Sequence, residues 1–239
     1  LYLLSNGYVD HIVLNDADPF IYAFWHSVVN HPDAFIEKIV NTPVTMESRA
    51  HFQDVLQNPV GHSALERGFA AFFLNRTSRS GILTGGVIGG NDQTGSYKID
   101  ARFNKENLIS RVEAIGRMHK HITVLGTDAL SVVADLSPCF PENTTIFMDP
   151  PYYVQGSRLY RKHYQTTQHA EIARCVQYWD KPILITYDDV HEIRELYKHS
   201  GMDTASLSLR YSTTMNRPVV DELVLYANLE LPDRLRHAA

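Results

Sequence analysis

Asp149, Pro150, Pro151 and Tyr152 follow the apolar run "TIFM" directly. Each proline fixes φ and removes an N–H group, so this corner is rigid and presents hydrogen-bond acceptors. A carboxylate and a backbone carbonyl on one rigid edge can accept both hydrogens of an exocyclic amine and direct its lone pair toward an electrophile. Tyr152 adds a flat face on which a base can stack. Surface turns also use Asp and Pro, but this ordered tetrapeptide arises by composition in only about one such chain in a thousand, which favours a functional corner.

Two acid-free windows indicate where a polyanion would bind, although the net charge of the chain is -5. The first runs from Pro150 to Ala170, beside the corner. Its candidate DNA-binding residues are Arg158, Tyr160, Arg161 and Lys162. The second runs from Arg67 to Asn91, and its candidates are Arg76 and Arg79. A local basic face is sufficient for nucleic-acid binding, whereas an ordinary solvated loop is the alternative interpretation of each single arginine.

Short β-rich runs alternate with helical patterns in the second half of the chain and predict the elements that position the corner. The expected strands are residues 11–16, 122–128, 145–152, 182–189, 204–212 and 222–229. Such alternation predicts an α/β fold with a mostly parallel sheet, in which functional groups gather at the carboxyl ends of the strands. Asp16 and Asp128 are the last residues of two expected strands, and Asp149 follows "TIFM" at the corner of a third. A helix N-cap or a turn is the alternative role for Asp16 and Asp128.

The long stretch between the first two expected strands predicts an insertion. It contains helical patterns, one of them N-capped by Asn104, and the glycine-rich "SGILTGGVIGGNDQTGSYKID", which we expect to form a hairpin-like loop. We therefore divide the chain into residues 1–26 with 116–239 as one domain and residues 27–115 as an insertion.

The composition is that of a globular protein, with 44% hydrophobic and 21% charged residues, and no apolar run is long enough to span a membrane. Cys139 and Cys175 show neither metal-binding spacing nor a paired framework, which favours a reducing, cytoplasmic setting and no metal. No obligate protein partner is evident from the sequence.

The corner "DPPY", with "VLNDAD" upstream, "NRTSRSG" in mid-chain and "RFNKENLISRVEAI" followed by "TDA", resembles the Dam-like adenine-specific DNA methyltransferases, the D12 class. The resemblance runs from Leu1 to about Tyr226. It implies a class I, Rossmann-like methyltransferase sheet with an antiparallel C-terminal strand. It also implies that S-adenosylmethionine donates a methyl group to the N6 amine of an adenine flipped out of double-stranded DNA.

Roles follow from the resemblance position by position. Asp149 and the Pro150 carbonyl would hold the amine, Pro151 would shape the corner, and Tyr152 would stack on the adenine. For the cofactor, Asp16 would bind the ribose hydroxyls and Asp128 the adenine amine, and Asp149 would be the third cofactor-binding residue. The window that contains Arg76 and Arg79 would belong to the part that recognises DNA.

The family's glycine-rich cofactor loop and its Gly-Lys segment have no counterpart in this sequence, which opens as if in mid-helix. We therefore expect a longer protein with roughly 30 to 45 further N-terminal residues. Two alternatives stay open. One is methylation of RNA adenine or of the N4 amine of cytosine in DNA, and the other is a catalytically silent or truncated DNA-binding relative.

Overall fold

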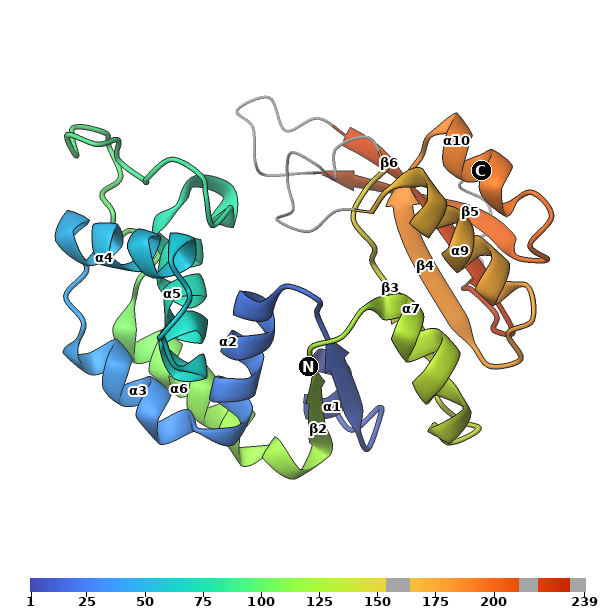
Figure 1. Ribbon diagram of the computed structural model, residues 1–239, viewed down its shortest axis with the longest axis horizontal. Coiled ribbons are helices and arrows are strands. Elements are labelled where there is room, and N and C mark those ends of the chain that lie inside the picture. The colour runs from blue at the N-terminus through green and yellow to red at the C-terminus, as the bar shows by residue number, and fades with distance from the viewer. Residues whose placement is uncertain (154–163, 211–218, 233–239) are drawn as a thin grey trace. The chain divides into compact units, whose positions relative to one another are not determined.

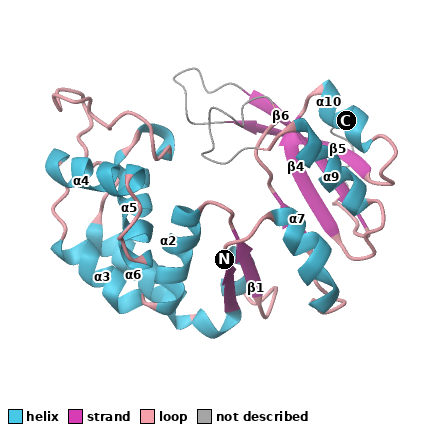
Figure 2. Ribbon diagram, in the orientation of Figure 1, coloured by secondary structure: helices cyan, strands magenta, loops and turns pink. Residues whose placement is uncertain are grey.

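The computed structural model describes residues 1–153, 164–210 and 219–232. These form two compact units, residues 1–127 and 128–239, which are described separately below. The elements of each can be followed in Figure 1, and Figure 2 distinguishes helices from strands. The insertion boundaries expected from the sequence stay a prediction.

Unit 1 (residues 1–127) consists of five longer helices, a short N-terminal helix and a two-stranded parallel sheet among its described elements. The helices are α1 (Tyr2–Ser5), α2 (Pro19–Asn30), α3 (Pro32–Asn41), α4 (Met46–Gln57), α5 (Ala64–Thr77) and α6 (Lys105–Arg117). The strands β1 (Ile12–Asn15) and β2 (Ile122–Leu125) pair in parallel, with Ile12 opposite Ile122. Short 3-10 turns occur at Arg79–Gly81 and His119–His121.

Local capping explains where several of these helices begin. Asp18 accepts a hydrogen bond from the Phe20 N–H at 2.8 Å, and Pro19 at the first helical position has no N–H to satisfy. Ser63 and Glu66 form a complete capping box at the start of α5. Asn104 caps α6 by accepting from the Asn107 N–H, which confirms the N-cap predicted from the sequence.

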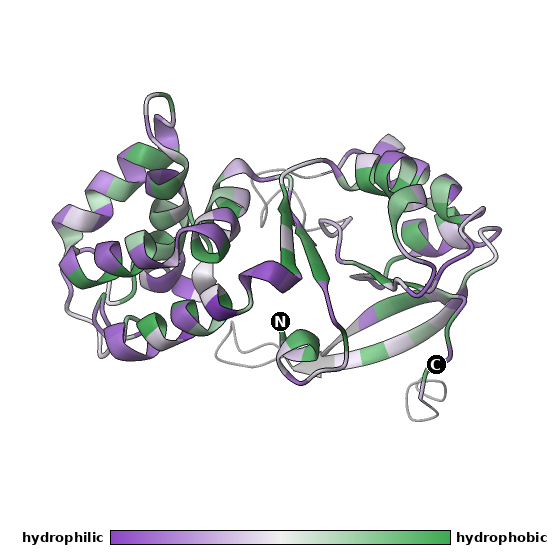
Figure 3. Ribbon diagram, turned by 90° about the horizontal axis from the view of Figure 1, so that it is seen from below, coloured by the Kyte–Doolittle hydropathy of each residue, from purple (hydrophilic) through white to green (hydrophobic). Residues whose placement is uncertain are grey.

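Aromatic side chains dominate the core of unit 1. Phe35, Phe69 and Phe73 are completely buried, and their rings pack against other phenylalanines at centroid distances of 4.7 to 6.5 Å. Gly68 lets α5 approach α2 closely, because a Cβ at that position would lie 2.5 Å from the Ala23 carbonyl oxygen. Figure 3 shows hydrophobic and hydrophilic residues interleaved along these helices, as expected for helices with one buried face.

The glycine-rich segment differs from the hairpin expected from the sequence. Among the described residues it forms turns, with a single antiparallel bridge between Ser78 and Val87. The Gln93 side chain bonds to backbone groups of this segment: it donates to the carbonyls of Ile88 and Gly90 and accepts from the Ile99 N–H. Side-chain bonds of this kind replace the backbone ladder that a hairpin would need.

Unit 2 (residues 128–239) contains a four-stranded sheet in the order β3-β4-β6-β5. Its strands are β3 (Ile146–Met148), β4 (Ile183–Asp188), β5 (Asp203–Arg210) and β6 (Val219–Ala227). β3 and β4 are parallel, whereas β6 is antiparallel to both β4 and β5. The reversed last strand therefore agrees with the sheet implied by the resemblance.

Helices cover one face of this sheet. They are α7 (Ala129–Ser131), with irregular turns to Cys139, α9 (Thr166–Val176) and α10 (His191–Tyr197). Ile172 of α9 and Ile193 of α10 are buried in one cluster with Ile183, Ile185 and Tyr187 of β4. Since side chains alternate along a strand, Leu184 and Thr186 point to the opposite face.

The single sheet expected from the sequence is described as two sheets, one in each unit. Among the described residues, no strand pairs with both β1 and β3, so each of these lies at a sheet edge. The mixed α/β class and the parallel pairings agree with the expectation. Within those same ranges, no helix is both long and apolar enough to cross a membrane.

Candidate active site

The Asp-Pro-Pro-Tyr corner begins where β3 ends and is fastened to β4. Pro150 is buried, whereas Asp149 is exposed. The Thr186 hydroxyl donates to Asp149 Oδ1 at 3.0 Å. After the corner, the Tyr153 N–H donates to Asp188 Oδ1 at 2.8 Å. Alternate residues of one strand therefore hold both ends of the corner.

Tyr152 is fastened to the next strand of the sheet. Its hydroxyl donates to Oε1 of Glu222 on β6, a residue that is only 5% exposed. Glu222 stands opposite Asp188 in the antiparallel β4–β6 register. The ring of Tyr152 is thus held at its polar end, which limits how the aromatic face can turn.

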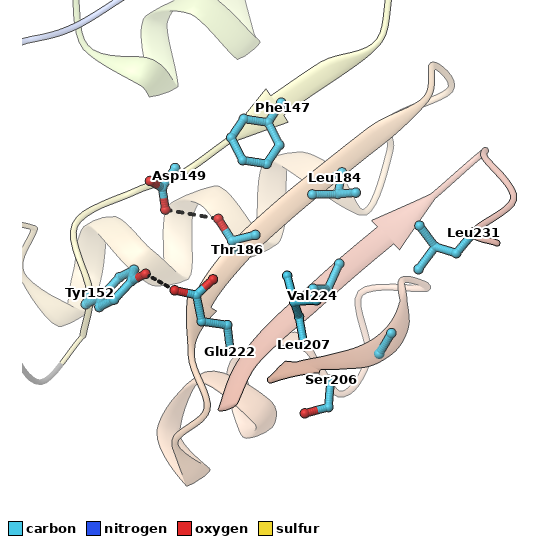
Figure 4. A pocket seen from close by; sticks show the side chains of 11 residues that line it. Phe147, Asp149, Tyr152, Leu184, Thr186, Ser206, Leu207, Glu222, Val224 and Leu231 are labelled. Atoms are coloured by element: carbon cyan, nitrogen blue, oxygen red, sulfur yellow. Dashed lines mark hydrogen bonds between the residues drawn. The ribbon is translucent and has the colours of Figure 1, made fainter. Parts of the chain in front are cut away.

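Asp149 and Tyr152 line a pocket of about 420 Å³. Its polar end contains these two residues with Thr186 and Glu222, and Figure 4 shows the four side chains directed toward one another. The rest of the lining is Phe147, Leu184, Ala205, Ser206, Leu207, Val224 and Leu231. An apolar wall with a few convergent polar groups is typical of a small-molecule site. A planar, amine-bearing group is therefore a suitable ligand.

The surroundings of Asp149 disfavour its charged form. Loss of hydration raises the pKa of this carboxyl, and the negative charge of Glu222 raises it further, while the hydrogen bond from Thr186 acts in the opposite direction. A carboxylate made more basic in this way accepts hydrogen bonds from an amine more strongly. Asp149 thus combines solvent access with raised proton affinity.

Asp128 caps a short helix at the start of unit 2. Its Oδ1 accepts from the Leu130 N–H at 2.9 Å, and the Tyr164 hydroxyl lies 3.3 Å from both carboxylate oxygens. Burial and then the charge of Asp128 raise the pKa of Tyr164, so the phenol stays a hydrogen-bond donor. The N-cap role considered from the sequence is present, and the cofactor role of Asp128 stays a proposal.

Asp16 directly follows β1 in unit 1. It accepts from the Asp18 N–H at 2.8 Å, and its own N–H donates to the Leu125 carbonyl at 3.2 Å. Asn15 is tied reciprocally to the backbone of Thr127. The ends of β1 and β2 are therefore tied to each other by hydrogen bonds.

The arginines expected to contact DNA have different surroundings. Arg76 donates from Nε to the Arg102 carbonyl at 2.8 Å, and Arg102 donates to the Ser78 carbonyl at 3.3 Å. Burial lowers the pKa of Arg76, and the charges of Arg102 and Arg111 lower it further. Arg79 is exposed. Arg76 thus shapes the loop, whereas Arg79 is accessible.

The four residues expected beside the corner lie outside the described residues. They are Arg158, Tyr160, Arg161 and Lys162. In the described ranges, no group of three or more His, Cys, Asp or Glu side chains is arranged to hold a metal ion.

Sequence reasoning missed the two residues that fasten the corner, Thr186 and Glu222. Thr186 sits in the middle of an apolar strand and gives no signal of its own. Glu222 gives a weak sequence signal, because this glutamate begins the apolar run "ELVLYANL" and glutamate is rarely buried without a partner.

A strand-end corner of this composition, on a mixed α/β sheet, is the arrangement expected of an enzyme that modifies a planar amine. The family model described as D12 class N6 adenine-specific DNA methyltransferase matches residues 4–215, which is most of the chain. The chain therefore belongs to this family. A search of curated proteins found no match.

Proposed function

We propose that this chain transfers a methyl group from S-adenosylmethionine to the N6 amine of an adenine that has rotated out of double-stranded DNA. The observation that carries the proposal is the position of Asp149 and Tyr152 on one edge of a pocket, each held by a side chain of a neighbouring strand. Membership of a family of DNA adenine methyltransferases supports the same reaction.

Asp149 and the Pro150 carbonyl orient the amine in this proposal. Each accepts one N6 hydrogen, so the nitrogen lone pair leaves conjugation with the ring and points at the methyl group. When bound, S-adenosylmethionine supplies that methyl on a positively charged sulfur. The methyl–sulfur bond would break as the N–C bond forms, and the sulfur would leave as a neutral thioether. Asp149 would stabilise the positive charge on the nitrogen, and one N6 proton would then leave to solvent. Orientation and electrostatics supply most of the acceleration.

Tyr152 holds the base by stacking. The N6 amine is engaged in pairing while the adenine is inside the duplex, so the base must leave the helix before the corner can reach it. A ring held at its hydroxyl offers a preformed stacking surface and replaces part of the stacking lost from DNA.

The residues available to hold the cofactor fit a nucleoside in chemical type. Asp16 and Asp128 are carboxylates at or just after strand ends, where ribose hydroxyls and amines are commonly bound. From the family resemblance, Asp16 would hold the ribose and Asp128 the cofactor's adenine amine, with Asp149 as the third cofactor-binding residue.

DNA binding is assigned to the two acid-free windows. Arg79 is the accessible candidate in unit 1, and Arg76 contributes positive potential while it supports the loop. Arg158, Tyr160, Arg161 and Lys162 would contact the strand around the flipped base. Such contacts make affinity fall steeply with salt.

The decisive experiment incubates the product of the complete coding sequence with methyl-labelled S-adenosylmethionine and DNA that lacks methylated adenine. Wild type should yield N6-methyladenine, Asp149→Ala should yield none, and Asp180→Ala, an exposed aspartate of the same unit, should behave as wild type. Digestion of the product to nucleosides separates N6-methyladenine from N4-methylcytosine, and RNA serves as a competing substrate. Full activity in Asp149→Ala, or no transfer by wild type, contradicts the proposal.

A further inference from the structure

Glu222 has a position that the acceptor chemistry above does not use. It lies on β6 with 5% of its surface exposed, accepts the Tyr152 hydroxyl, and lines the same pocket end as Asp149 (Figure 4). Its neighbours Leu223 and Leu225 are fully buried on the helix-covered side of the sheet. Burying a carboxylate in such an apolar strand costs free energy unless hydrogen bonds or nearby charges compensate for its lost hydration.

A purely structural tether does not require a charge at this position. A neutral amide would accept the Tyr152 hydroxyl without the desolvation cost of an anion. What the carboxylate adds is a negative charge close enough to Asp149 to raise its pKa, together with burial. Two carboxylates therefore converge on the pocket end where an amine would be held.

We propose that Glu222 is a positioning residue of the methyl transfer, which fixes the ring of Tyr152 through its hydroxyl and strengthens Asp149 as an acceptor through its charge. The inference rests on the proposed function, because it assigns Glu222 a part in holding the acceptor amine. As the N–C bond forms, the nitrogen becomes positive, so a second nearby negative charge favours that step electrostatically.

The two roles can be separated by three variants. Glu222→Ala removes both the acceptor and the charge, and we expect kcat to fall roughly 10- to 100-fold, as for loss of a charge-assisted hydrogen bond. Glu222→Gln keeps an acceptor for Tyr152 but removes the charge, so it should recover only part of that loss near neutral pH. Tyr152→Phe should lower kcat while it leaves the charge in place. Glu192→Gln, on the exposed side of α10, is the matched control.

The pH dependence is the readout that a merely structural role would not move. Activity requires ionised Asp149, and the charge of Glu222 raises the pKa of that carboxyl. Glu222→Gln should therefore shift the acidic limb of the pH–kcat profile to lower pH. Tyr152→Phe and Glu192→Gln should leave the limb in place. Carboxyl carbon NMR titration of Asp149 in the ligand-free protein should show the same downward shift in Glu222→Gln.

The outcomes distinguish this inference from the function on which it rests. Wild type without methyl transfer overturns both. An active wild type, combined with an unmoved acidic limb and an unmoved Asp149 titration in Glu222→Gln, overturns the inference alone. Wild-type kcat in a folded Glu222→Ala, as judged by its thermal unfolding, overturns it as well.

Discussion

Arg49 is a buried cation that holds the loop after α5 by hydrogen bonds. It is 3% exposed, and Nη1 donates to the hydroxyls of Thr77 at 2.9 Å and Ser78 at 3.0 Å, while Nη2 donates to the Gly85 carbonyl at 2.7 Å. Burial lowers its pKa. Within the described ranges no carboxylate forms an ion pair with Arg49, so these three acceptors must offset the cost of removing the cation from water.

Arg49→Met tests whether the hydrogen bonds of the guanidinium outweigh the cost of its desolvation. Methionine keeps much of the apolar stem, so packing changes little and the loss of the donors dominates. Three hydrogen bonds from a charged donor, corrected for the desolvation that the cation no longer suffers, predict that unit 1 loses about 3 kcal/mol of unfolding free energy. The Gly85 carbonyl also loses its charged donor.

Urea unfolding monitored through Trp25 measures this change. A Trp179→Phe background restricts the fluorescence to unit 1, which contains Trp25. Arg117→Met at the exposed end of α6 is the control and should change the free energy by less than about 0.5 kcal/mol. If Arg49→Met matches the control or is more stable than wild type, desolvation cancels the hydrogen bonds and the reasoning is wrong.

Three further predictions concern packing and pH. Gly68→Ala should destabilise by about 1 to 3 kcal/mol, because the added Cβ would lie 2.5 Å from the Ala23 carbonyl, while Gly86→Ala meets no atom within 4 Å and should be nearly neutral in thermal unfolding. Asp149→Asn should be inactive yet more stable than wild type at pH 7. Folding raises the pKa of Asp149, so the wild-type protein loses unfolding free energy as pH rises through that pKa, whereas the asparagine variant does not. Burial lowers the pKa of His169, so stability should fall below about pH 6.5, and His169→Gln should reduce that fall in urea titrations.

Each of these predictions has a contradicting result. Equal unfolding temperatures for the two glycine variants would mean that α5 can move away from α2 to make room for the added Cβ at no cost in stability. For Asp149→Asn, the gain in stability should vanish as pH falls below about 3, where the carboxyl is largely protonated in both the folded and unfolded states, and a gain that persists there has another cause. An unchanged acid slope in His169→Gln would assign that slope to other groups.

Much of the local structure follows from the sequence. The six β-rich runs become the six described strands within a few residues, and Asn104 caps the helix as expected. These signals are local, because apolar alternation and capping involve residues only a few positions apart. The hairpin expected in the glycine-rich segment did not form, because side-chain bonds from Arg49 and Gln93 hold that segment as turns.

The sequence by itself determined the chemistry of the corner, since Asp149, two prolines and Tyr152 specify an acceptor edge and a stacking ring wherever they are placed. Only the tertiary structure decided how that corner is held. Thr186 lies 37 positions from Asp149 and Glu222 lies 70 positions from Tyr152, and the β3-β4-β6 strand order brings them together. Strand pairing is a long-range choice governed by burial and register, so no local pattern could have identified Glu222 as the partner of the corner.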